Sequence, residues 1–100
     1  MKVFKFGGAS IKDVPSIKNI LKIISIYNED RLVIVVSAMG KTTNALELVV
    51  HNYFNNKENL QASILEVYNF HSEIINNLFV KTHPIFSDIS KSFEKLNSFI

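Results

Sequence analysis

Residues 31–37 read RLVIVVS, and every position from 32 to 36 carries a branched aliphatic side chain. The β-branched side chains at residues 33–36 favour extended backbone. A strand that is apolar on both faces is typical of a parallel sheet covered by helices on both sides. The run therefore predicts a buried β-strand in an α/β fold.

The segment before this run supplies the other parts of a βαβ unit. Residues 2–6, KVFKF, are β-prone and stop at a glycine pair. Asp13 is a candidate helix N-cap, and Pro15 suits the first turn, where a missing N–H costs nothing. A stripe at helical spacing follows, and residues 28–30 break it. The stripe comprises Ile17, Ile20, Leu21, Ile24 and Tyr27.

The segment after the run predicts about three helices over residues 45–100, which follow a βαβ unit over residues 1–44. Asn44 with Glu47 resembles a capping box, and Thr43 is the rival cap. A seam spaced four and three apart predicts a long helix that ends at residues 82–84, and a similar seam follows it. The seams comprise Leu60, Ile64, Val67, His71, Ile74 and Leu78, then Phe86, Ile89, Phe93, Leu96 and Ile100.

The composition excludes several classes of protein. The chain has 100 residues, 47% of them hydrophobic, and a net charge of +2, which gives no footprint for nucleic acid or a membrane surface. It has no cysteine, and its three histidines lack metal-ligand spacing, so we expect no metal site. The chain offers no signal sequence or spanning segment, and a cytoplasmic location is expected.

Two predicted strands leave both edges of a parallel sheet unpaired. A truncated larger domain explains this pattern better than a complete small one. We therefore expect the 100-residue chain to self-associate through the strand edge or the helical hairpin, and to lack activity by itself.

Two loops at the carboxyl ends of the strands are candidates for ligand binding. In the first, Lys5 precedes Gly7 and Gly8, whose backbone N–H groups can approach a phosphate. The second, residues 37–44, leads into a helix and suits an anion. Both also suit ordinary structural roles, a tight turn and a helix cap. Residues 40–42, GKT, do not complete a Walker A motif, because Val35 stands where its first glycine belongs.

The motifs KFGGAS at residues 5–10 and VSAMGKTTN at residues 36–44 resemble the amino acid kinase superfamily, specifically the aspartate kinases. Ala9 replaces the threonine or serine of the first signature, whereas Ser37, Gly40, Thr43 and Asn44 match the second. The close resemblance covers residues 2–48. It implies an incomplete three-layer αβα fold, an oligomeric full-length protein, and ATP-dependent phosphorylation of L-aspartate, the first step of lysine, threonine and methionine biosynthesis.

The same resemblance implies the roles of particular residues. Lys5, together with Phe6, Gly7 and Gly8, would bind the ATP phosphates, and Lys5 would also be catalytic. Ser37 would line the reaction centre, and Thr43 would contact aspartate. Mg²⁺ would accompany ATP.

Two other hypotheses remain open. The chain could belong to a different member of the superfamily that phosphorylates another carboxylate or a carbamate, which the residues 43–44 signature disfavours. It could also be a non-catalytic helical interaction module, because the helical hairpin makes up nearly half of the sequence.

Overall fold

The computed structural model describes residues 1–28 and 30–100. The chain forms two compact units, Met1–Thr43 and Asn44–Ile100. Glu29, in the break predicted at residues 28–30, lies outside the described residues. The predicted α/β class is confirmed. The elements in chain order are β1 (Lys2–Phe6), the 3-10 helix η1 (Gly8–Ile11), α1 (Val14–Ile26), β2 (Leu32–Val36), α2 (Thr42–Asn55), the 3-10 helix η2 (Lys57–Asn59), α3 (Leu60–Leu78) and α4 (Ile85–Ser98).

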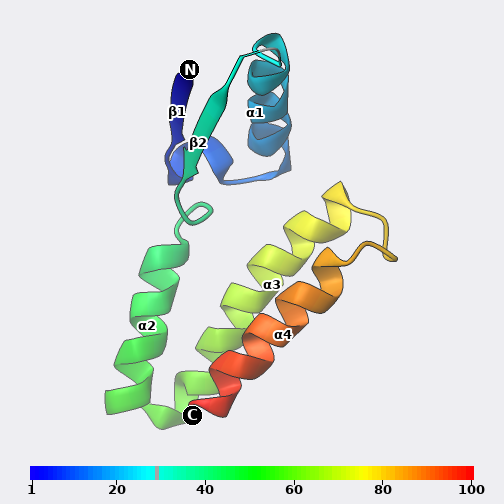
Figure 1. Cartoon of the computed structure of the whole chain (residues 1–100). Coiled ribbons are helices and arrows are strands. Elements are labelled where there is room, and N and C mark those ends of the chain that lie inside the picture. Colours follow the sequence, from blue (N-terminus) through cyan, green and yellow to red (C-terminus); the bar gives the residue numbers. More distant parts are fainter. Residues whose placement is uncertain (29) are drawn as a thin grey trace. The chain divides into compact units, whose positions relative to one another are not determined.

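In the first unit, β1 and β2 form a parallel sheet that α1 connects (Figure 1). Their register places Lys2 opposite Leu32 and Phe6 opposite Val36. The βαβ unit predicted from the sequence is therefore confirmed. In a parallel pair the carboxyl ends of both strands reach the same edge, and both glycine-bearing loops follow from there.

The start of α1 follows its sequence signals closely. The Asp13 carboxylate accepts a hydrogen bond from the Ser16 backbone N–H at 2.9 Å, and Pro15 lies in the first turn. Hydrogen bonding from the Ser16 side chain and backbone N–H holds the pKa of Asp13 below its usual value. Both predicted start signals, the cap and the proline, are thus confirmed.

The core of the first unit lies on one face of its sheet. Side chains alternate between the two faces of a strand, so Phe4 and Phe6, which pack in the core, share the face that α1 covers. The opposite face remains open, and Val35 on it is 47% exposed. The core consists of Phe6, Ile11 and Ile20, with Phe4, Ile17, Ile24 and Met39 packed against them.

The expectation that β2 would be buried on both faces is wrong within the described residues. Its positions 33–36 are all exposed, between 42% and 58%. The physical reason is that α1 alone covers the sheet of this unit, and it packs chiefly against β1 and the loops.

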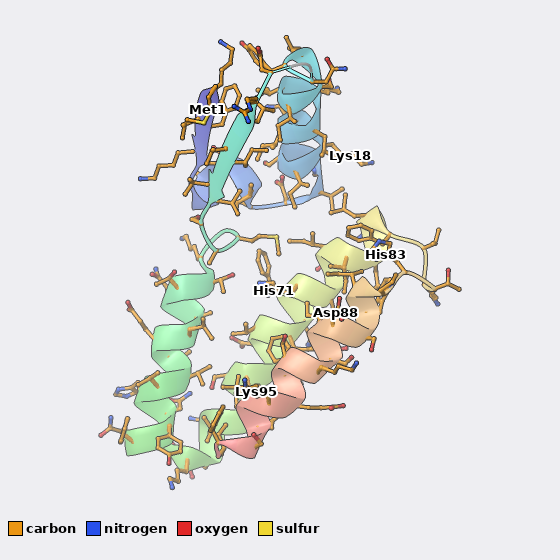
Figure 2. The ribbon with its side chains drawn as sticks, in the orientation of Figure 1. Met1, Lys18, His71, His83, Asp88 and Lys95 are labelled. Carbon is orange, nitrogen blue, oxygen red and sulfur yellow. The ribbon has the colours of Figure 1, made fainter. Side chains whose placement is uncertain are left out.

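The second unit is a helical assembly in which α3 and α4 lie side by side as a hairpin (Figure 1). The rings of Tyr68 and Phe93 join the two helices, with centroids 5.2 Å apart. His71, on the predicted seam, is half-buried, and its Nδ1 lies 2.8 Å from the Val67 carbonyl oxygen (Figure 2). The core comprises Val49, Leu60, Ile64 and Val67, with Ala45, Tyr53, Phe93 and Leu96 packed against it.

The predicted start of α2 is wrong. The helix begins at Thr42, so Thr43 and Asn44 lie within its first turn rather than ahead of it. The Thr42 backbone N–H and its hydroxyl both donate to the Met39 carbonyl oxygen, at 3.1 and 2.5 Å. This turn leads directly into the helix, and Asn44 cannot form the capping box with Glu47 because an N-cap needs non-helical backbone.

The predicted end of α3 is also wrong, because the helix stops at Leu78 and not at residues 82–84. Phe79 has extended backbone, and its ring packs 4.4 Å from that of His83. In the last turn the Asn77 side chain donates to the Glu73 carbonyl oxygen at 2.8 Å. Such local side-chain bonds compete with helical structure.

Candidate active site

The first loop leaves β1 at Phe6 and enters η1 at once. Gly7 has extended backbone and forms the N-cap of η1, and its carbonyl oxygen accepts a bond from the Ser10 N–H at 3.0 Å. Ile11, at the end of η1, is buried in the core of the first unit. The short loop is therefore held in place at both ends.

The second loop, residues 37–41, is held to the same core. The Ser37 N–H donates to the Phe6 carbonyl oxygen at 3.0 Å, which extends the pairing of the strands beyond β2. The Met39 side chain packs against the core of the first unit. Gly40 adopts the left-handed conformation, with φ of 57°, which favours glycine.

The two loops are in direct contact. The Gly40 N–H donates to the Gly8 carbonyl oxygen at 3.2 Å. A Cβ placed on Gly8 would lie 2.6 Å from the Gly40 oxygen and 3.4 Å from the Ala38 oxygen, whereas one on Gly7 would meet nothing within 4 Å. The adjacent glycines thus differ: Gly8 allows the loops to approach, and Gly7 borders open space.

Three of the predicted site residues share one side of the sheet. Lys5 is opposite Val35 in the register, and alternation places both on the face away from α1. Continuing the pairing by one residue brings Gly7 opposite Ser37 on that same face. The positive charge of Lys5, the hydroxyl of Ser37 and the accessible backbone of Gly7 therefore lie together at the carboxyl edge of the sheet.

Besides Gly8, which contacts the second loop, two predicted residues lie elsewhere. The Phe6 side chain is only 9% exposed and belongs to the core, so it offers no side-chain contact to a ligand. Thr43 is exposed in the first turn of α2, directly after the second loop. The binding roles of all these residues stay predictions.

The charged and hydroxyl side chains at this edge are exposed to solvent. Lys5 and Lys41 are both exposed. The Ser37 hydroxyl donates to the neighbouring Ala38 carbonyl oxygen at 2.8 Å, a local bond that a ligand can replace. Such a site can bind and orient an anion, whereas proton abstraction would need a base beside the serine.

Sequence reasoning missed two residues that shape the second loop. Thr42 is 7% exposed, and its hydroxyl donates a hydrogen bond to the Met39 carbonyl oxygen. From the sequence, its place in the GKT stretch indicates only a partial likeness to a nucleotide-binding motif. Met39 lies among small and hydroxyl-bearing residues, so the sequence predicts an exposed loop position for it. No local pattern predicts that a loop methionine joins the core.

Neither a metal site nor a membrane span emerges from the part of the chain that the structure describes. Among residues 1–28 and 30–100, no three His, Cys, Asp or Glu side chains gather closely enough to hold a metal ion. In the same residues, no helix combines the length and the apolar character needed to cross a bilayer.

Comparison with known proteins places the chain. The family model described as "Amino acid kinase family" matches residues 1–94. Two relatives from Arabidopsis thaliana are similar over a shorter stretch. "Aspartokinase 2, chloroplastic" is 48% identical over 44 residues, 44% of this chain, and "Aspartokinase 1, chloroplastic" is 48% identical over 46 residues, 46% of this chain.

The chain spans about 8% of the length of each of these relatives. The family match, in contrast, extends through both units and includes both loops at the edge of the sheet. The chain therefore belongs to the amino acid kinase family.

Proposed function

We propose that these residues serve an aspartate kinase, which transfers the γ-phosphoryl group of ATP to the β-carboxylate of L-aspartate. The contact between the two loops carries the proposal, because it brings the predicted nucleotide and aspartate segments to one edge of the sheet. The aspartokinase relatives support the choice of acceptor. The reaction would begin lysine, threonine and methionine biosynthesis, in the cytoplasm.

The chemistry suits the residues at this edge. A β-carboxylate has a pKa near ~3.9 and is already ionised at neutral pH, so the reaction needs no general base. It needs alignment of the two substrates and neutralisation of charge on the phosphoryl oxygens. Lys5 supplies positive charge, Gly7 offers backbone close to open space, and Ser37 and Thr43 orient the acceptor.

The residues fit ATP better than they fit Mg²⁺. Open space beside Gly7 leaves room for phosphate next to the backbone, and exposed Lys5 can reach it. Mg²⁺ prefers carboxylate oxygens, and the described residues offer no cluster of them. We therefore assign Mg²⁺ no ligand and no step in this chain.

One observation favours a second candidate function, a helical interaction module. An apolar groove of about 340 Å³ lies between the end of α2, the start of α3 and the last residues of the chain, and several residues in it are exposed, among them Phe54 at 75% and Val50 at 56%. If binding to a partner were the function, it would survive substitution of Gly7 in the first unit.

The test is aspartate-dependent release of ADP by the full-length gene product. Hydroxylamine traps an acyl phosphate, so hydroxamate should form in step with ADP. The 100-residue chain should form none, because part of a site cannot position both substrates. Turnover with a different carboxylate or a carbamate, but not with aspartate, would contradict the proposed acceptor and favour another family member.

A further inference from the structure

The contact between Gly8 and Gly40 joins two loops that are far apart in the sequence. The Gly8 carbonyl oxygen accepts the Gly40 N–H at 3.2 Å, and the missing Cβ of Gly8 leaves the Gly40 oxygen room to lie there. An added Cβ would lie 2.6 Å from that oxygen. Both oxygens near it, those of Ala38 and Gly40, belong to backbone and cannot rotate away as a side chain would.

The far side of the second loop is also fixed. Met39 packs against the core of Phe6, Ile11 and Ile20, and its carbonyl oxygen accepts two bonds from Thr42. The middle of the loop is thus held by the Met39 anchor on one side and by the contact with Gly8 on the other. A side chain added at Gly8 would therefore displace residues 38–40. Ser37 and Thr43 flank that segment on either side.

We propose that Gly8 and Gly40 are positioning residues that set the second loop, and with it Ser37 and Thr43, against the first loop. Gly8 belongs to the predicted phosphate loop, yet its steric role is directed at the predicted aspartate loop. Gly7, its neighbour, has open space in place of this contact. The kinetic part of the proposal rests on the proposed function, whereas the contact itself does not.

The matched pair Gly8→Ala and Gly7→Ala in the full-length gene product tests the proposal kinetically. The two variants add the same methyl group to adjacent residues. Gly8→Ala should raise the KM for aspartate by about tenfold, the effect of one lost hydrogen bond to a charged group. Gly7→Ala should raise the KM for ATP and leave that for aspartate unchanged. A purely structural role for Gly8 would instead lower the active fraction with both KM values unchanged, and that result would overturn the proposal.

A second measurement does not depend on activity. Lys41 lies in the second loop and is exposed, so the rate of trypsin cleavage after it reports how firmly the loop is held. Cleavage should be several-fold faster in Gly8→Ala than in Gly7→Ala. Equal rates in the two variants would overturn the proposal. If the wild-type protein showed no turnover with aspartate, the proposed function would fail while this comparison still decided the contact.

Two variants at Gly40 test the proposal even if Gly8→Ala fails to fold. Because Gly40 has φ of 57°, alanine is strained there, whereas asparagine tolerates the left-handed region. Gly40→Ala should raise the KM for aspartate and speed cleavage after Lys41, and Gly40→Asn should recover most of both. Identical behaviour of the two variants would show that the loop's conformation does not position the aspartate site.

Discussion

The two units of this chain hold their hydrophobic residues differently. In the second unit, α2, α3 and α4 all contribute to one core, and residues such as Ile64, at 4% exposed, are buried. In the first unit only one face of the sheet is covered, and apolar β2 residues such as Val36 remain 58% exposed. The candidate ligand groups belong to the open unit. We therefore expect stability to depend chiefly on the second unit and ligand binding on the first.

The largest expected effect is on stability, from truncation in the enclosed core. Ile64→Ala should lower the free energy of unfolding by ~2–5 kcal/mol, because a cavity adds to the lost burial. The matched change Ile34→Ala, at a β2 position that is 42% exposed, should lower it by about 1 kcal/mol or less. Urea unfolding followed by circular dichroism measures both. Equal losses of unfolding free energy in the two variants would contradict the difference in burial between the two units.

The next effect concerns self-association, which we propose for the 100-residue chain. The exposed edge of β2 carries no lysine or proline, the residues that usually protect strand edges, whereas β1 carries Lys2 and Lys5. Val35→Lys should weaken association by at least about tenfold, as one buried charge would. Sedimentation velocity over a range of concentrations gives the dissociation constant.

Val50→Lys, in the apolar groove of the second unit, is the control for association through the helices. If only Val50→Lys weakened association, the helical face rather than the strand edge would be the interface. A wild-type chain that stayed monomeric at every concentration would contradict self-association altogether.

What the sequence could predict was local in character. Asp13 and Pro15 mark the start of α1 through contacts within one turn, and the seam from Leu60 to Leu78 predicts the existence of α3, although not the residue at which it ends. The approach of Gly8 to Gly40 joins segments that no short-range pattern connects, so the sequence indicated two loops but not their contact. The proline rule placed the end of α3 at residues 82–84, whereas the helix stops at Leu78 and Phe79 takes extended backbone.

The smallest expected effect is at the cap of α1. Hydrogen bonds from Ser16 depress the folded-state pKa of Asp13, so its contribution to stability is complete above the ordinary pKa and is lost as the pH falls through the depressed value. Asp13→Ala should lower Tm by a few degrees at neutral pH. Asp13→Asn keeps an acceptor for the cap and should lower it less.

Thermal melts at pH values from neutral to about 2 measure this pH dependence. The difference in Tm between wild type and Asp13→Ala should shrink only at the acid end of the series, below the usual carboxyl range. A difference that disappeared well above that range would contradict a depressed pKa for Asp13.

The most direct test of the site on the open unit is steady-state kinetics of Lys5→Ala in the full-length gene product. Loss of a charge that stabilises the phosphoryl oxygens should lower kcat by ~10²-fold or more and leave the KM for aspartate nearly unchanged. Thr43→Val, which removes a polar contact to the amino acid at near-constant volume, should chiefly raise that KM. If Lys5→Ala changed only the KM for aspartate, Lys5 would not act on the transferred phosphoryl group and the proposed site would be wrong.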